Sequence, residues 1–189
     1  MNRDDILNFL TDNLKPKRVA HSLGVEKAAR ELARRYGCDE EQAALAGLTH
    51  DCAKGMGAVQ MAAYAADAGF PMDEIARHSP QILHAPAGAM LARRALGIAD
   101  EAVLGAIFWH TVPKPGMSTL EKIVSVADMT EENRDYDGVE SVRRAARTDL
   151  EAAFRLSLGR SILHVVSNNL VLHPATVQVY NELCLQVAK

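Results

Sequence analysis

Aromatic residues and cysteines are scarce in this chain, and no long uninterrupted apolar run occurs in it. Phenylalanine, tryptophan and tyrosine together make up 5% of the 189 residues. The three cysteines, Cys38, Cys52 and Cys184, are far apart and form no CxxC pair, which argues against a disulfide framework or a structural zinc knuckle. No apolar run approaches the roughly 18 residues that a membrane-spanning helix needs. We therefore expect reduced thiols and no membrane anchor.

The chain also lacks a secretory signal and a strong net charge. Asp4 and Asp5 precede only a short amphipathic stretch at the N-terminus, whereas a secretory signal has a basic start and an apolar centre. The net charge of −3 argues against a nucleic-acid backbone as the main partner. These absences predict a cytoplasmic protein that binds neither nucleic acid nor a membrane. The sequence is compatible with a homodimer but has no self-complementary stripe that would require one.

An α-helical pattern runs along the chain from end to end. Apolar residues recur every three or four positions, and no strand-like alternation persists. The pattern predicts helices at about 3–14, 16–37, 39–55, 58–68, 72–77, 84–97, 100–110, 118–131, 139–168 and 174–187, with a break near Asp149. We expect an all-α protein with a single domain over residues 1–189. Its motif-bearing core should lie at about 16–135 and its C-terminal helices at about 139–188.

Residues typical of helix ends mark several of these boundaries. Gly37 is placed to end the second helix. Asp39 is a good N-cap for the third helix, and Gln42, three residues later, completes a capping-box pattern. Irregular segments are expected at 111–116 and 132–138, where loops could grip a phosphate.

Six histidine and aspartate residues in the helical segments have apolar or small neighbours, as inward-facing positions do. They are His21, His50, Asp51, His84, His110 and Asp128. Imidazole and carboxylate ligands together suit iron, manganese, cobalt or zinc better than magnesium. Six ligands are too many for one hydrolytic ion that must keep positions open for water and substrate. Two metal ions bridged by a carboxylate satisfy both conditions, and Asp51, adjacent to His50, is the natural bridge.

The order of these residues resembles that of the HD superfamily of metal-dependent phosphohydrolases. The resemblance is carried by RVAHSLGV (18–25), LAGLTHDCAK (45–54), HAPAGAMLA (84–92), HTVPKPGMSTLEKIVSVAD (110–128) and NRDYDGVESVR (133–143). These segments look like those of the YqeK-type branch, the bacterial symmetrical diadenosine tetraphosphate hydrolases. The resemblance extends from about residue 5 to 185. It implies an HD-domain helical bundle with a buried two-metal site.

The resemblance also implies a division of ligands and a reaction. Two iron ions are expected, the first held by His21, His50, Asp51 and Asp128 and the second by Asp51, His84 and His110. The implied reaction is hydrolysis of a dinucleoside tetraphosphate at its midpoint, so that diadenosine tetraphosphate and water give two ADP. A hydroxide held between the metals would attack phosphorus in line with the departing diphosphate.

Cations close to the ligands are expected to bind the polyphosphate. Lys54 follows Asp51 by about one helical turn, and Arg18 precedes His21 by the same interval, so that each cation shares a helix face with a ligand. The irregular segments contribute a lysine, an arginine suited to bidentate phosphate contact, and a threonine hydroxyl. The expected catalytic residues are Asp51, Lys54 and Arg134, and the expected substrate-binding residues are Arg18, Lys54, Thr111, Lys114 and Arg134.

Three positions depart from the family pattern without removing a ligand. They are Cys52, Val112-Pro113 and Glu132, and they bear on substrate preference rather than on metal binding. Other activities therefore stay open: an HD-type nucleotidase, a dNTP triphosphohydrolase, a phosphodiesterase, or a nucleotide-binding regulator without turnover. Outside the motifs, His164 and His173 are interpreted as structural, and the basic cluster Arg143-Arg144-Arg147 as a solvated helix face.

Overall fold

A computed structural model describes residues 2–187 of the chain. Residue 1 and residues 188–189, which the expected domain limits include, lie outside the described residues. All regular elements in residues 2–187 are helical, which confirms the all-α prediction. In this part of the chain no helix has both the length and the apolar character needed to cross a membrane.

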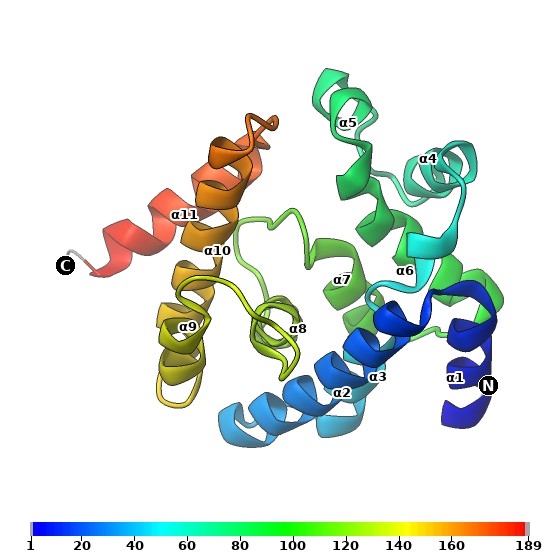
Figure 1. The fold of residues 1–189 in the computed structure, drawn as a ribbon, viewed down its shortest axis with the longest axis horizontal. Helices are drawn as coiled ribbons and strands as arrows, with labels where there is room; N and C mark the ends of the chain where they lie inside the picture. The colour runs from blue at the N-terminus through cyan, green and yellow to red at the C-terminus, as the bar shows by residue number, and fades with distance from the viewer. Residues whose placement is uncertain (1, 188–189) are drawn as a thin grey trace.

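The helices follow the predicted order closely (Figure 1). They are α1 (Arg3–Asn13), α2 (Pro16–Tyr36), α3 (Glu40–Thr49), η1 (Cys52–Gly55), α4 (Ala58–Asp67), α5 (Glu74–His78), η2 (Pro80–Leu83), α6 (His84–Ala95), α7 (Glu101–Trp109), α8 (Thr119–Thr130), α9 (Val139–Ala146), α10 (Leu150–Ser167) and α11 (Pro174–Val187). The break predicted near Asp149 is confirmed, because this residue caps α10 by accepting a hydrogen bond from the backbone N–H of Ala152. Gly37 ends α2 with φ of 67°, the left-handed conformation that glycine favours.

Two local predictions were wrong in the third helix. We expected it to continue through His50 and Asp51, but α3 ends at Thr49 and a separate 3₁₀ turn follows. The expected capping box is only half formed. The Asp39 carboxylate accepts from the N–H groups of the first turn, whereas the Gln42 amide donates to Asp100 Oδ2 at 2.8 Å. A tertiary contact with the start of α7 has taken the place of the local one.

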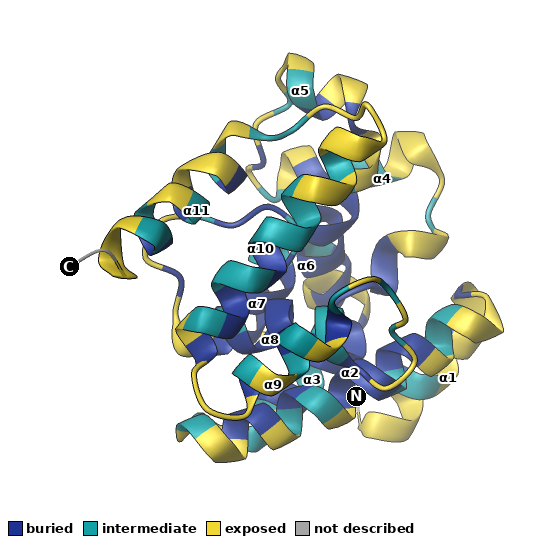
Figure 2. Cartoon of the chain, turned by 60° about the vertical axis from the view of Figure 1, so that its left-hand side comes forward, coloured by how far each residue is buried: buried dark blue, intermediate teal, exposed yellow. Residues whose placement is uncertain are grey.

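The core lies where α2, α3, α6, α7 and α8 meet (Figure 2). Helix α2 packs against α3 and α8, and α7 packs against α3, α6 and α8. At the α2–α3 contact a Cβ on Gly47 would lie 2.9 Å from the carbonyl oxygen of Val25. Glycine thus lets these two backbones approach closely, which brings the end of α3 beside the middle of α2.

Helices α9, α10 and α11 form the C-terminal part of the described chain. Helix α10 packs against α8, α9 and α11, and Figure 1 shows α10 and α11 on the side of the molecule opposite α1. The segment between α10 and α11 lies near the top of this view, across from α5. The chain between α6 and α8 therefore has N-terminal helices such as α1 on one side and the C-terminal helices α10 and α11 on the other.

Candidate metal centre

The six predicted ligands converge from elements that are distant in sequence. His21 is in the middle of α2, His50 and Asp51 follow α3, and His84 begins α6. His110 directly follows α7, and Asp128 is in α8. Three groups of these side chains place ligand atoms within 4.8 Å of one another: His21, His50 and Asp51; His50, His110 and Asp128; Asp51, His84 and His110. The five residues other than Asp128 are buried.

Asp51 lies between two pairs of histidines. Its Oδ2 is 3.4 Å from His50 Nε2 and 3.8 Å from His21 Nε2. Its Oδ1 is 3.3 Å from His84 Nε2 and 3.8 Å from His110 Nε2. A carboxylate with one oxygen toward each pair has the arrangement that a metal-bridging ligand requires.

All four histidines direct Nδ1 toward an oxygen acceptor and Nε2 toward the cluster. For His50, His84 and His110 the acceptor is the backbone carbonyl three residues earlier, at 2.7, 2.5 and 2.7 Å. For His21 it is Glu131 Oε1, at 3.1 Å. Such an acceptor fixes the proton on Nδ1 and leaves the Nε2 lone pair for a cation, the usual environment of a metal-binding histidine.

Several polar atoms in the cluster lack a partner, which fits a metal site. His50 Nε2 and Asp51 Oδ1 are buried and make no hydrogen bond within the described residues. The Nε2 atoms of His84 and His110 lie 3.1 Å apart, although both are acceptors when Nδ1 carries the proton. Buried polar groups are almost always satisfied, and a divalent cation bound among these atoms would satisfy them together.

The charges of the cluster also suit a cation. Burial lowers the pKa of His84 to about 4 and that of His110 to about 3, so both are neutral imidazoles near pH 7. Burial opposes ionisation of Asp51 and Asp128, but the neighbouring histidines outweigh it and hold both pKa values well below the usual range. Burial would lower the pKa of His50, yet the two carboxylates raise it to about 10. The carboxylates therefore attract positive charge, which a proton or a metal ion can supply.

Glu131 is a residue of the candidate site that the sequence analysis missed. Its side chain is buried, and Oε2 accepts from the backbone N–H and the amide of Asn133 at 2.7 and 3.0 Å. A Cβ on Gly24 would collide with Oε2, so the glycine in α2 gives this carboxylate room to reach His21. The spacing could have revealed it, because Glu131 follows Asp128 by three residues, about one turn of α8.

Three of the predicted substrate-binding cations contact the carboxylates of the cluster. Arg18 Nη1 donates to Asp51 Oδ2 at 2.7 Å, and Lys54 Nζ lies 3.4 Å from Asp51 Oδ1. Arg134 forms an ion pair with the Asp128 carboxylate and donates from Nε to the Asp128 carbonyl at 2.6 Å. The structure thus brings these cations to the edge of the candidate metal site.

Lys114 is the predicted site residue that the structure does not bring to the cluster. Its ammonium pairs with Glu121 at 2.9 Å and lies 5.3 Å from the centre of the Trp109 ring. A buried carboxylate such as that of Glu121 needs a nearby cation, and Lys114 supplies it. Thr111, by contrast, is at the cluster, with Oγ1 3.1 Å from His84 Nε2.

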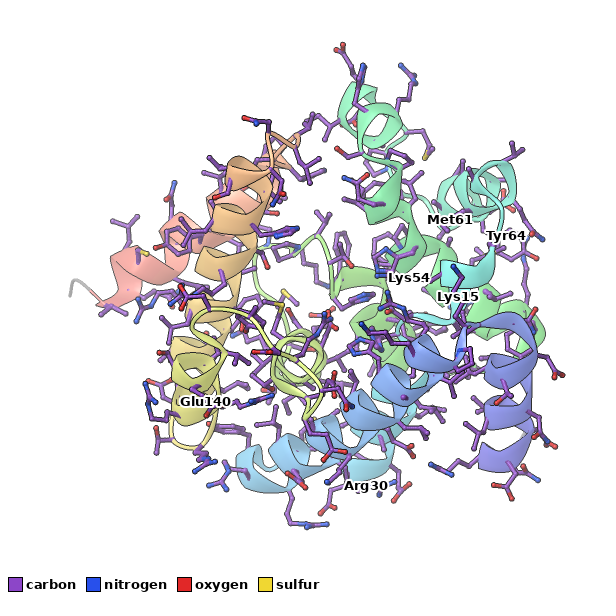
Figure 3. All side chains as sticks on the ribbon, in the orientation of Figure 1. Lys15, Arg30, Lys54, Met61, Tyr64 and Glu140 are labelled. Carbon is purple, nitrogen blue, oxygen red and sulfur yellow. The ribbon has the colours of Figure 1, made fainter. Side chains whose placement is uncertain are left out.

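A cavity of about 960 Å³ opens from the cluster. Its basic lining comes from Lys15, Lys17, Arg18, Lys54, Arg134 and Arg160; Lys15 and Lys54 are labelled in Figure 3. Thr111 and Val112 line it as well, while Lys114 is not among the described residues that do. His164 and His173, which the sequence analysis interpreted as structural, both line this cavity, and that interpretation stays a prediction. The cavity thus joins the candidate metal site to a cationic wall that suits an anion.

Comparison with known proteins agrees with this geometry. The HD domain family matches residues 18–133. Two curated relatives are named "Bis(5'-nucleosyl)-tetraphosphatase, symmetrical". The one from Halalkalibacterium halodurans is 39% identical over 98% of this chain and 99% of its own length, and the one from Bacillus subtilis is 38% identical over 97% and 98%.

A solved structure is also similar. It is the crystal structure of a Clostridium acetobutylicum protein described as a "predicted HD superfamily hydrolase involved in NAD metabolism". It has a TM-score of 0.93 and 38% sequence identity, and the match covers 98% of each chain. Because the family match, the relatives and this fold agree over nearly the whole chain, the chain belongs to the HD-domain hydrolases, in the group of the symmetrical bis(5'-nucleosyl)-tetraphosphatases.

Proposed function

We propose that this protein is a metal-dependent hydrolase that cleaves dinucleoside tetraphosphates symmetrically, converting diadenosine tetraphosphate and water into two ADP. The observation that supports this most is the position of Asp51 between two histidine pairs, beside a cation-lined cavity that His21, His84, His110 and Asp128 of the same cluster line. Curated relatives that match nearly the whole chain carry the name of this activity. The substrate would be a free nucleotide of the cytoplasm.

The cluster would hold two metal ions, one on each side of Asp51. His21, His50 and Asp128 would complete one set of ligands, and His84 and His110 the other. We propose iron as the metal, with manganese, cobalt and zinc as alternatives that the same donor atoms accept. Bound metal ions supply a nucleophile at neutral pH by lowering the pKa of water, and they neutralise phosphoryl oxygens.

The other residues would bind and orient the tetraphosphate. Arg18, Lys54 and Arg134 already contact carboxylates of the cluster, so their donors are at the correct end of the cavity to bind phosphoryl oxygens. Thr111 would donate its hydroxyl hydrogen to a phosphate oxygen. Oriented cations of this kind stabilise the charge that moves to the leaving group as the bond breaks.

In the balanced reaction, a water oxygen bonds to one of the two central phosphorus atoms. The bond between this same phosphorus and the oxygen that bridges it to the other central phosphorus breaks, and the electron pair leaves on that oxygen with the second diphosphate. Lys54, whose ammonium lies 3.4 Å from Asp51 Oδ1, would stabilise that oxygen. The protons of the water pass to the solvent. Each product carries two phosphates, which is the outcome that defines symmetrical cleavage.

Only one of the three departures from the family pattern reaches the cavity. Val112 lines it, whereas Cys52 and Glu132 are not among the described residues that do. Cys52 is buried, with Sγ 3.4 Å from the carbonyl oxygen of Gly88, and burial raises its pKa to about 12. Glu132 is exposed and pairs with Lys27 at 2.8 Å. We infer that Val112 is the departure that can influence substrate preference.

The test is to purify the protein anaerobically, count its metals and follow the products from diadenosine tetraphosphate by chromatography. We expect about two metals per chain and ADP as the sole product. Asp51→Asn should reduce both the metal content and the activity. Metal binding without ADP formation would exclude the substrate, and a panel of dNTPs, nucleoside monophosphates and cyclic nucleotides would then identify the reaction. Failure to bind iron or manganese would contradict the metal site itself.

A further inference from the structure

One side of α10 forms a wall of the cavity. Its lining residues include Ser157, Arg160, Ser161 and His164, and their three- and four-residue spacing places them on one helix face. This wall lies outside residues 18–133, the segment that matches the HD domain family. The C-terminal helices therefore add a surface to the cavity that the HD domain alone does not supply.

Arg160 is a cation in this wall whose donors are not used by the protein. Its side chain is 33% exposed, and its nearest carboxylate oxygen, on Asp137, is 3.8 Å from Nη1, beyond hydrogen-bonding distance. Among the described residues its guanidinium makes no hydrogen bond. Its position is nevertheless defined, because the guanidinium packs on Gly138, where a Cβ would collide with it. The Gly138 backbone has φ of +90°, which glycine tolerates best.

Arg160 differs in this respect from the cations at the cluster. Arg18 and Arg134 direct their guanidinium groups at Asp51 and Asp128, so they serve the candidate metal site as well as any bound anion. Among the described residues, Arg160 faces only the exposed Asp137 carboxylate, which is 3.8 Å away and beyond hydrogen-bonding distance. Its planar guanidinium can donate two parallel hydrogen bonds to one phosphate, and no hydrogen-bonded protein carboxylate has to be displaced.

Part of the lining of the same cavity is apolar. Side chains of Leu158 and Val165 on α10 line it, followed by those of the segment 170–172 between α10 and α11. Leu170 and Val171 are 44% and 46% exposed. An apolar surface beside a cation suits a ligand with a flat base at one end and phosphates at the other.

We propose that the cavity-facing side of α10 binds one nucleoside diphosphate half of the substrate, with Arg160 contacting its phosphate and the 170–172 segment contacting its nucleoside. This inference rests on the proposed function. It identifies Arg160 as a residue that determines specificity for the nucleotide substrate. Metal binding would then depend on the HD core, whereas preference for a nucleotide would depend on the C-terminal helices.

The test compares Arg160→Met with the metal-loaded wild type. KM for diadenosine tetraphosphate should rise at least about tenfold, because a charge-assisted hydrogen bond is lost. The affinity for ADP, measured by titration calorimetry, should fall by a similar factor. Metal content should change much less, whereas KM for inorganic tetraphosphate, which keeps the phosphates that Arg160 contacts, should also rise. Arg160→Lys keeps the positive charge but loses the planar pair of N–H donors. Its KM and ADP affinity should therefore lie between those of the wild type and of Arg160→Met.

The matched control is Arg155→Met on the same helix. Arg155 is not among the described residues that line the cavity, so this variant should behave as wild type. An unchanged KM and ADP affinity in Arg160→Met would overturn the inference even when the wild type cleaves diadenosine tetraphosphate normally. If the wild type fails to cleave it, the proposed function fails, and the ADP titration still decides whether Arg160 binds a nucleoside diphosphate.

Discussion

Histidine orientation is the residue-scale feature that best suits the cluster to binding a metal ion. Three of the four imidazoles are held by a backbone carbonyl of their own helix or turn. His21 is the exception, since its Nδ1 faces a side chain, Glu131, from another helix. The orientation of His21 is thus the one that a single substitution can disturb.

We expect Glu131→Gln to weaken metal binding by about 10- to 100-fold, the usual effect of losing a carboxylate behind a ligand. The amide keeps the shape of the side chain but no longer supplies the negative charge that holds the Nδ1 proton. The measurement is metal affinity by competition with a chromogenic chelator. Glu132→Gln is the control, because Glu132 is exposed and pairs with Lys27. Equal metal affinities of Glu131→Gln and Glu132→Gln would contradict the role of Glu131 in orienting His21.

The buried histidines predict how the stability of the chelator-treated protein depends on pH. The pKa values of His84 and His110 are lowered from 6.5 to about 4 and about 3. Between pH 6.5 and about 4 the unfolded chain therefore binds more protons, so the folded state loses stability as the pH falls. His50 acts in the opposite direction, because its raised pKa of about 10 contributes stability below pH 6.5 that is lost as the pH rises toward 10.

Thermal unfolding of the chelator-treated protein should accordingly give its highest Tm near pH 6.5, and Tm should decline toward both pH 4 and pH 9. His84→Gln and His110→Gln should each flatten the acid side of this profile. A Tm that stays constant between pH 6.5 and 4.5 would show that these imidazoles are not held neutral by burial.

At the scale of elements, Arg143 joins α9 to the end of α8 and to the loop that follows it. Nε donates to the carbonyl of Thr130 at 3.0 Å, and Nη2 donates to the carbonyls of Glu131 and Arg134 at 2.7 and 2.9 Å. The interpretation of the basic cluster as a solvated face is therefore wrong for this residue. The loop that Arg143 holds carries both the carboxylate behind His21 and the arginine at Asp128.

Arg143→Met should loosen this loop and destabilise the protein by about 1–3 kcal/mol, because carbonyls at the end of α8 lose their donor. Hydrogen exchange should increase over 131–138, and KM should rise more than kcat falls, since Arg134 is less well placed. Arg144→Met is the control, because Arg144 is exposed and, within residues 2–187, its side chain donates only to Ser141 Oγ, at 3.3 Å. An unchanged rate of hydrogen exchange over 131–138 in Arg143→Met would contradict the role of Arg143 in holding this loop.

At the scale of the whole molecule, the candidate metal site connects helices that are separate in sequence. Its ligands come from α2, the turn after α3, the start of α6, the end of α7, and α8. Since metal bound to the folded state alone stabilises that state by mass action, folding and metal loading are expected to be coupled.

Removal of metal should lower the Tm by about 10 °C, which follows from about 4 kcal/mol at a thousandfold excess over Kd and about 2–4 °C per kcal/mol. Differential scanning calorimetry of the loaded and chelator-treated protein measures this. The same treatment of Asp51→Asn should produce little shift, because that variant has little metal to lose. An unaltered Tm in the wild type would indicate that the cluster does not bind metal tightly.

The sequence by itself determined the helices and the identity of the cluster. Apolar spacing and residues such as Gly37 and Asp149 define helices through local chemistry, so the boundaries were predictable. His21, His50 and Asp51 were recognisable because ligand chemistry restricts the residue types and the family preserves their order. The pattern could not show that α3 ends before His50, since that depends on the packing around the cluster.

Only the tertiary structure decided which polar side chains serve the site. Glu131, Arg143 and Arg160 are charged residues in a helical pattern, and nothing local distinguishes them from a solvated face. Nothing local distinguishes Lys114 from a solvated cation either. Its partner Glu121 is brought to it only when α7 and α8 pack together. A side chain's partner is fixed by contacts between distant segments, whereas its helix is fixed by neighbours in sequence.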